Sequence, residues 1–153
     1  MLSTDLIHHY RQLSQQPLTV VDVETTGRFA SDSRVTEISV LQATLADGVQ
    51  RQQTDLVNSK TIVPAKITEI TGITQLMVDQ AAIAAEVFPE YLPLLNMGVL
   101  TAHNLDFDYP FLQAEFRRLG VSFSRPETAK LCTVKFSRLM LPDLPSRSLP
   151  DLV

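Results

Sequence analysis

Two acidic residues lie inside a stretch that otherwise has the composition of a buried β-strand. Residues 18–27 read LTVVDVETTG, and the apolar positions of this run are mostly β-branched, which favours a strand. Side chains alternate across a strand, so Asp22 and Glu24 point to the same face at its carboxyl end. Removing an unpaired carboxylate from water costs on the order of several kcal/mol. The pair therefore predicts a cation held between the two carboxylates.

A second group of acids occurs in residues 101–112, TAHNLDFDYPFL. It falls where a predicted strand ends and a helix begins, which is where α/β sheets usually present functional groups. For Asp106 the pattern favours a helix N-cap, a role that Asp commonly takes. Asp108 heads the predicted helix, and the resemblance described below decides its role. Glu37, inside the predicted second strand, fits equally well a partly buried acid satisfied by backbone donors and a site residue.

The apolar periodicity and the turn residues predict the elements that must position these acids. Strands are expected over residues 18–24, 35–45, 49–57, 98–102 and 129–133, and helices over 4–14, 65–80 with a break at Thr71-Gly72, 84–96, 107–119 and through Leu139. Within 84–96, Pro93 predicts a kink or a late start. Three strands in a meander followed by alternating helices and strands indicate an α/β fold with a mixed sheet of five strands.

No internal repeat or linker divides the chain, so we expect one domain over residues 1–153. Residues 1–16 form an N-terminal helix ahead of a core that starts at residue 18. At 153 residues and 44% hydrophobic content, the chain can bury a sizeable core.

The composition argues against binding through a broad basic surface, because the formal net charge is −4. The seven bases of residues 111–153 either solvate helix faces or form one wall of a phosphate-binding groove. Cys132 is the single cysteine, which excludes an internal disulfide and favours a reducing compartment. No apolar run approaches the roughly 20 residues of a membrane span. We expect a cytoplasmic protein with no membrane partner.

The strings VVDVETTG and AHNLDFDYPFL resemble the first and second exonuclease motifs of the DnaQ-like, or DEDD, family of 3′-to-5′ exonucleases. The proofreading epsilon subunit of bacterial DNA polymerase III belongs to this family. ITGIT (70–74) and LCTVKFSRLMLP (131–142) are also similar, so the resemblance covers nearly the whole chain from Leu18 onward. It implies a ribonuclease H-like fold and a metal-dependent exonuclease that releases nucleoside monophosphates from DNA 3′ ends.

The resemblance also implies a role for each acid. Asp22 would bridge two divalent ions, Glu24 would bind one of them, and Asp108 would support the other. Two metal ions can activate a water and stabilise the leaving oxygen of a phosphodiester. Hard oxygen ligands suit Mg²⁺ or Mn²⁺.

Substrate contacts are implied in the same way. The turn after the first strand would bring its backbone to the 3′-terminal nucleotide, and two positions before Gly72 match nucleotide contacts in some relatives. Asn104 more plausibly fixes its loop by hydrogen bonds. The candidate substrate-binding residues are Thr25, Thr26, Gly27, Lys66, Thr71 and Asn104.

The family's third motif, His or Tyr followed by four residues and an Asp, is missing. No His follows His103, and Arg138 and Ser146 stand five residues before Asp143 and Asp151. The chain therefore has three of four expected carboxylates and no general base, although the TTG turn favours His as that base. We expect a C-terminally truncated, incomplete ribonuclease H-like core whose activity is weak or absent.

Two other functions remain open. The chain could be an exoribonuclease domain, or a non-catalytic module that binds nucleic acid or a partner through a decayed metal site. The intact acids argue against decay, whereas the missing motif argues for it. The favoured partner is a single-stranded DNA 3′ end, with a polymerase or helicase subunit as a further partner. Some other α/β enzyme with structural acids is the least favoured reading.

Overall fold

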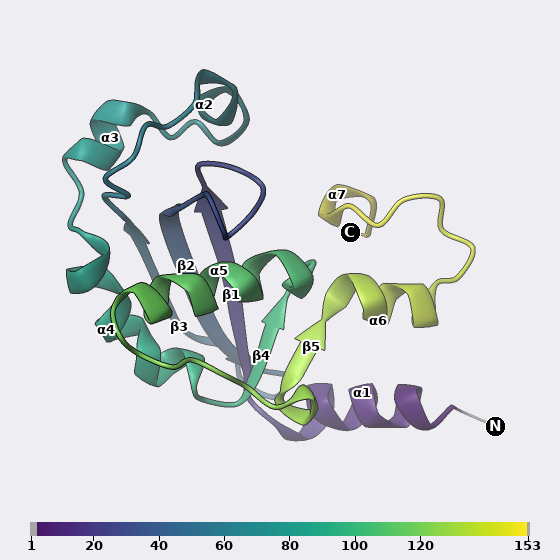
Figure 1. Ribbon diagram of the computed structural model, residues 1–153. Coiled ribbons are helices and arrows are strands. Elements are labelled where there is room, and N and C mark those ends of the chain that lie inside the picture. Colours follow the sequence, from purple (N-terminus) through teal and green to yellow (C-terminus); the bar gives the residue numbers. More distant parts are fainter. Residues whose placement is uncertain (1–2, 153) are drawn as a thin grey trace.

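The computed structural model describes residues 3–152 and arranges them as a five-stranded sheet with helices packed around it (Figure 1). The strands are β1 Leu18–Thr25, β2 Val35–Thr44, β3 Gly48–Leu56, β4 Val99–Ala102 and β5 Lys130–Cys132. The helices are α1 Thr4–Gln15, α2 Ala65–Thr71, α3 Gln75–Asp79, α4 Ala84–Leu95, α5 Leu105–Arg118, α6 Thr133–Met140 and α7 Leu149–Leu152, with a 3₁₀ turn at Glu127–Ala129.

The sheet has the strand order β3-β2-β1-β4-β5. β1, β2 and β3 pair in antiparallel fashion, whereas β4 lies parallel to β1 and β5 lies parallel to β4. This mixed sheet confirms the predicted α/β class. The pairing of β1 with β4 ends at Val20 and Thr101, so the last residues of β1 have no strand partner on that side.

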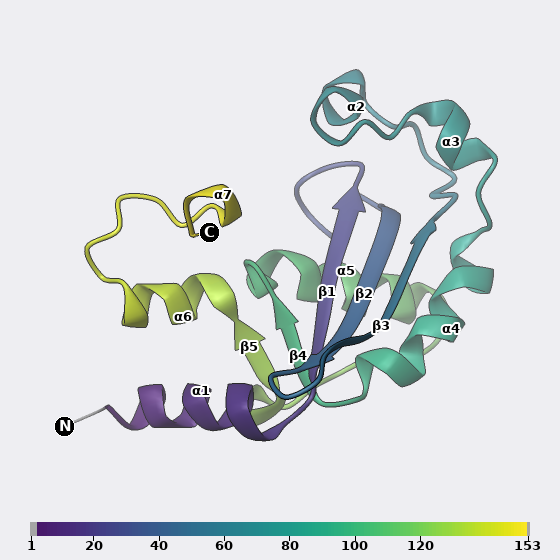
Figure 2. The same ribbon diagram turned by 180° about the vertical axis from the view of Figure 1, so that it is seen from behind.

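Helices α4 and α5 cover one face of the sheet and bury the main core (Figure 1). Val21 and Val23 of β1 point into this core, where Phe88, Phe111 and Phe116 of the two helices meet them. None of the described helices crosses the opposite face of β1, β2 and β3 (Figure 2). β1 is therefore buried on one face only, rather than inside the fold on both sides.

Helix α4 corrects one prediction, because it continues from Ala84 to Leu95 through both of its prolines. The late start expected as one result of Pro93 is wrong, because the helix begins at Ala84; the alternative of a kink stays a prediction. Pro93 lies in the last turn of the helix, where its missing N–H removes a single backbone hydrogen bond. Six side chains of α4 are buried, and their packing outweighs that local cost (Ala84, Val87, Phe88, Tyr91, Leu94 and Leu95).

Helix α5 begins two residues before its predicted start, at Leu105. Its N-cap position is Asn104, whose backbone is left-handed with φ 77°. Asp106 is therefore inside the first turn, and the prediction that it caps the helix is wrong. Its carboxylate instead pairs with Lys135 of α6 at 2.9 Å. Asn is well suited to the left-handed position, which few other non-glycine residues adopt readily.

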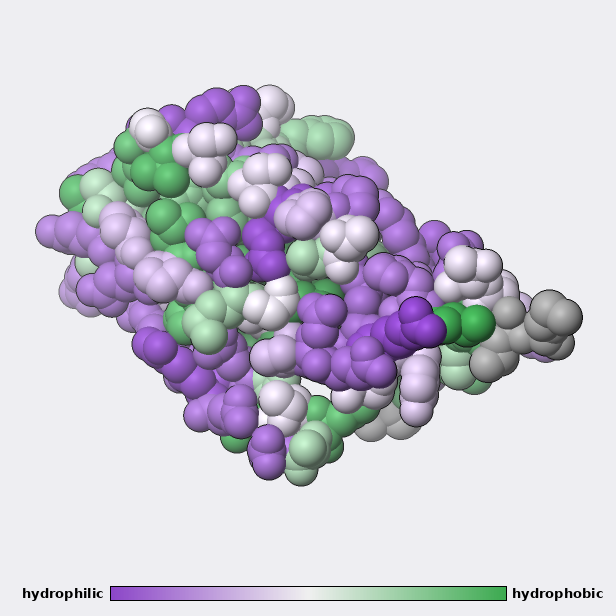
Figure 3. All heavy atoms as spheres, turned by 90° about the horizontal axis from the view of Figure 1, so that it is seen from below, coloured by the Kyte–Doolittle hydropathy of each residue, from purple (hydrophilic) through white to green (hydrophobic). Residues whose placement is uncertain are grey.

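Seen from below, hydrophilic side chains cover most of the surface, with apolar ones in scattered groups (Figure 3). Among residues 3–152 no helix is both long and apolar enough to cross a membrane.

Candidate active site

The carboxyl end of β1 presents the two acids that the sequence singles out. Val21, Val23 and Thr25 point into the core, so Asp22 and Glu24 share the opposite face, as their spacing predicts. Asp22 is open to water and Glu24 is half-buried. Burial still raises the pKa of Asp22 above its usual value. Burial raises the pKa of Glu24 as well, and the charge of Asp22 adds to that effect.

Asp108 joins these acids from the first turn of α5. Its side chain is only 2% exposed, and its Oδ1 accepts a hydrogen bond of 3.0 Å from the backbone N–H of Val23. That N–H is available because β4 has stopped pairing with β1 three residues earlier. Asp108 is thereby fixed against the residue that lies between Asp22 and Glu24.

The environment of Asp108 opposes its ionisation. The pKa of Asp108 is raised to about 7, mainly by burial and further by the charges of Asp22 and Glu24, although the hydrogen bond from the Val23 N–H works in the other direction. A protein that holds a cation among such carboxylates would favour their charged forms instead.

Glu37 is a fourth acid of this group. In the antiparallel register it stands directly opposite Glu24, and the charge of Asp22 raises its pKa after burial does. Within residues 3–152 no backbone donor reaches its side chain, so the reading of a satisfied structural acid is wrong. Its identity as a neighbour of Glu24 follows from strand register, which the sequence alone does not define.

The donor chemistry fits a hard divalent cation, because four carboxylates gather at one end of β1 and the charge of Asp22 raises the pKa of the other three. The four side chains do not, however, surround one common point where such an ion could bind. Among the residues that the structure describes, no three His, Cys, Asp or Glu side chains converge closely enough to hold a metal.

The turn after β1 is held by its own side chains. The Thr25 hydroxyl donates to the Gly27 carbonyl at 2.6 Å, and the Thr26 hydroxyl accepts from the Arg34 N–H at 3.0 Å. A Cβ on Gly27 would lie 2.5 Å from Ser33 Oγ, which is closer than real atoms approach. Both threonine hydroxyls are therefore used in closing the loop, and a side chain at position 27 would force the Ser33 hydroxyl to move.

A buried ion pair fixes the far end of the same loop. Glu115 of α5 is 1% exposed and accepts two hydrogen bonds from Arg34, at 2.8 and 2.9 Å. Arg118 donates to Glu115 at 3.0 Å and to the Ala30 carbonyl at 2.9 Å. The sequence analysis missed Glu115. The sequence does contain one indication of its role, because Glu115 lies four residues after Phe111, on the apolar face of the helix.

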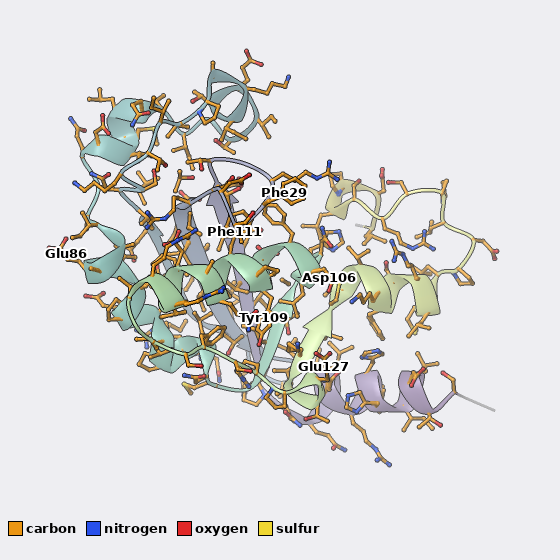
Figure 4. The ribbon with its side chains drawn as sticks, viewed as in Figure 1. Phe29, Glu86, Asp106, Tyr109, Phe111 and Glu127 are labelled. Atoms are coloured by element: carbon orange, nitrogen blue, oxygen red, sulfur yellow. The ribbon has the colours of Figure 1, made fainter. Side chains whose placement is uncertain are left out.

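An aromatic groove lies beside the loop. Phe29, which is 61% exposed, lines it together with Phe107 and Phe111 of α5 and the exposed Asn104. Figure 4 shows Phe29 on the loop above the first turns of α5 and Glu86 far from it on α4. The side chain of Asn104 makes no hydrogen bond within residues 3–152, so the prediction that it fixes the loop in this way is wrong.

The two remaining candidates lie on α2, which extends beyond the same end of the sheet as the tip of β1 (Figure 1). Lys66 is exposed and pairs loosely with Glu69 at 3.5 Å. The Thr71 hydroxyl donates to the Ile67 carbonyl and accepts from the Ile73 N–H. Neither side chain touches the acids, so the structure does not bring these two residues into the site.

The fold and its acids define an α/β protein with an acidic site at the carboxyl end of β1, the central strand of a mixed sheet. A family model named RNase_T, described as "Exonuclease", matches residues 19–153. The chain belongs to this exonuclease family.

Two relatives in sequence are a DNA polymerase III PolC-type from Clostridium perfringens and the 3′-5′ exonuclease DinG from Bacillus subtilis. The first is 31% identical over 140 residues, which is 91% of this chain and 9% of that protein. The second is 30% identical over 142 residues, which is 92% of this chain and 15% of that protein. The chain thus spans only a small part of either relative.

Solved structures share the fold. Escherichia coli exonuclease I in complex with a dA16 oligonucleotide superposes with a TM-score of 0.77 at 16% identity, over 90% of this chain and 35% of that one. Exonuclease X in complex with 5′ overhanging duplex DNA gives a TM-score of 0.65 at 21% identity, over 85% and 68%. These similarities confirm the predicted ribonuclease H-like fold.

Proposed function

We propose that the chain is a metal-dependent 3′-to-5′ exonuclease domain that acts on single-stranded DNA ends. The observation that carries the proposal is the hydrogen bond from Val23 to Asp108, because it fixes the α5 carboxylate beside Asp22 and Glu24. Membership of the exonuclease family and the folds of the DNA-bound neighbours support it.

Asp22, Glu24 and Asp108 would hold Mg²⁺ or Mn²⁺, with Glu37 beside Glu24 adding negative charge. Bound divalent ions would supply an activated water and stabilise the leaving oxygen of the phosphodiester. The Val23 N–H orients Asp108, and the main core behind Val21 and Val23 keeps the strand rigid under the acids.

The loop and the aromatic groove would receive the DNA. The backbone of Thr25, Thr26 and Gly27 forms the turn directly after the acids, and Phe29 offers an exposed ring for stacking on a base. Asn104 lies in the same groove with an unused amide. Lys66 and Thr71 would take part only if the substrate reached α2.

DNA is favoured over RNA because one sequence relative is named a DNA polymerase III and two structural neighbours are complexes with DNA. A polymerase chain is the partner class that the PolC-type relative suggests, and a helicase chain is kept as a second candidate from the sequence. We also propose a cytoplasmic location, which the single cysteine and the polymerase-type relative support.

The test is digestion of a 5′-labelled single-stranded DNA in the presence of Mn²⁺. We expect a ladder that shortens from the 3′ end with the native chain and with Asp106→Asn, and none with Asp22→Ala. Asp106 is the matched control because it is an exposed acid two residues from Asp108. After Asp108 no His or Tyr stands five residues before an Asp, so turnover should be about 10²–10⁴ slower than with a general base.

A ladder that is equal in the native chain and in Asp22→Ala would contradict the assignment of the acids. Binding of the DNA without any cleavage, unchanged by Mn²⁺, would instead favour the non-catalytic module. An RNA oligonucleotide of the same sequence, digested faster than the DNA, would show the exoribonuclease alternative.

A further inference from the structure

His103 connects two parts of the chain that are far apart in sequence. It lies in the short connection between β4 and α5, at the same end of the sheet as the acids of β1. Its Nδ1 is 2.8 Å from the Thr133 hydroxyl, at the start of α6. Its Nε2 is 2.7 Å from the carbonyl oxygen of Arg147, which is 44 residues further along.

The contact with Arg147 defines one hydrogen position on the imidazole ring. A backbone carbonyl can only accept, so Nε2 must carry the hydrogen that is donated to Arg147. The Thr133 hydroxyl, which also lies 3.4 Å from the Ala102 carbonyl, contacts the other ring nitrogen, Nδ1. His103 is therefore oriented by one partner and donates to the other.

Arg147 in turn organises the segment that follows α6. Its guanidinium donates to the carbonyls of Leu144 at 2.7 Å, Leu141 at 2.8 Å and Pro142 at 3.2 Å. Residues 141–147 thus close into a loop around the side chain of their own Arg147.

The segment has few other attachments. Residues 141–152 are exposed or half-buried, so no apolar core holds them. Within residues 3–152, the bond from His103 is the one hydrogen bond that joins residues 141–152 to an element that precedes α6.

We propose that His103 is a positioning residue that fixes residues 141–152 beside the carboxyl ends of β4 and β5 through its Nε2–H. This segment includes α7, which lies at the same end of the molecule as the tip of β1 (Figure 1). The placement itself does not depend on nuclease activity, whereas its relevance to the acidic site rests on the proposed function.

Two substitutions separate the contacts of the ring. The amide nitrogen of Gln reaches the position of Nε2, so His103→Gln keeps a donor for the Arg147 carbonyl. The shorter Asn places its amide near Nδ1, so His103→Asn keeps the contact with Thr133 and loses Arg147.

The readout is cleavage of the Arg147–Ser148 bond by trypsin, without DNA or metal. We expect the native chain and His103→Gln to resist, and His103→Asn to be cut at least tenfold faster, with the same thermal midpoint. Cleavage after Arg51 in β3 is the internal control. Hydrogen exchange in a peptide over 141–152 should rise in parallel.

Arg147→Lys provides a second test that leaves His103 intact. Trypsin still recognises Lys, but one ammonium group cannot replace the guanidinium bonds to three carbonyls, so cleavage should accelerate. Equal protection of the native chain and His103→Asn, or equal cleavage of the Gln and Asn variants, would overturn the proposal. A failure of the nuclease assay with all variants would bear on the proposed function alone.

Discussion

Asp108 carries the sharpest electrostatic conflict among the individual residues. Its pKa is raised to about 7, first by burial and then by the charges of Asp22 and Glu24. When the pKa of an acid is higher in the folded state than in the unfolded state, protonation of that acid favours the folded state. That contribution is complete below about pH 4 and is lost as the pH rises through about 7, in the absence of metal.

Asp108→Asn should therefore separate stability from function. The Asn side chain can still accept from the Val23 N–H but carries no charge, so without metal at pH 8 the free energy of unfolding should increase by on the order of 2 kcal/mol. At pH 4 the two proteins should differ little. Urea denaturation at both pH values measures this, and a variant less stable than the native chain at pH 8 would disprove it.

Gly27 gives a second prediction at the residue scale. Gly27→Ala should lower the free energy of unfolding by about 1–3 kcal/mol, because its Cβ would overlap Ser33 Oγ. Ser33→Ala removes the overlapping atom, so the double variant should regain most of the loss. Denaturant melts of both single variants and the double variant give the coupling energy. Purely additive effects would refute the steric explanation.

The sequence predicted single residues only where one element sufficed. The alternation of β1 placed Asp22 and Glu24 together, and the motif resemblance added Asp108. Glu37 escaped assignment because its position opposite Glu24 depends on strand register. Asn104 was misjudged because its left-handed backbone, rather than a side-chain hydrogen bond, is what it contributes to the loop.

At the scale of elements, the loop after β1 depends on α5 for its shape. Arg34 and Arg118 both bind the buried Glu115, and Arg118 also donates to the Ala30 carbonyl of the loop. The hydrogen bond from Arg34 to Glu115 raises the pKa of the Arg34 guanidinium, followed by the charge of Glu115. The helix that supplies Asp108 thus also holds the turn beside the acids.

Glu115→Gln should destabilise the fold by about 2–3 kcal/mol, because it leaves two partly buried guanidinium groups without a counter-charge. Glu127→Gln is the matched control. Glu127, labelled in Figure 4, pairs with Lys130, but its side chain is 89% exposed, so the stability should change little. Thermal melts compare the two, and equal midpoints would show that the buried pair is dispensable.

The predicted elements agree with the structure except where packing overrides local preference. α4 keeps both prolines because six of its side chains are buried. α5 starts early because Asn104 accepts a left-handed conformation that propensity alone does not signal. The tie between His103 and Arg147 could not be predicted, since it joins residues with no shared pattern in the sequence.

At the scale of the whole molecule, charge limits how DNA can bind. The net charge is −4, and five of the seven bases of residues 111–153 are engaged within the protein: Arg118, Arg125, Lys130, Lys135 and Arg147. This arrangement does not support the alternative of a basic groove wall. On the proposed function, metal ions at the acids would then supply much of the attraction for phosphate.

Binding of a single-stranded DNA with an uncleavable 3′ linkage should therefore require Mn²⁺ and be lost when EDTA is added. Its affinity should fall only weakly with salt, with a log–log slope shallower than about −2, because few free Lys or Arg contact phosphates. Fluorescence anisotropy over a salt series measures both. Steep salt dependence that persists in EDTA would show a basic surface instead.

The claim that the acids of β1 and α5 form one metal site is tested most directly by Mn²⁺ titration followed by electron paramagnetic resonance. We expect the native chain and Asp106→Asn to remove free Mn²⁺ from solution with the same affinity. Asp22→Asn and Asp108→Asn should each weaken that binding at least tenfold. Unchanged Mn²⁺ affinity in both of these variants would contradict the account.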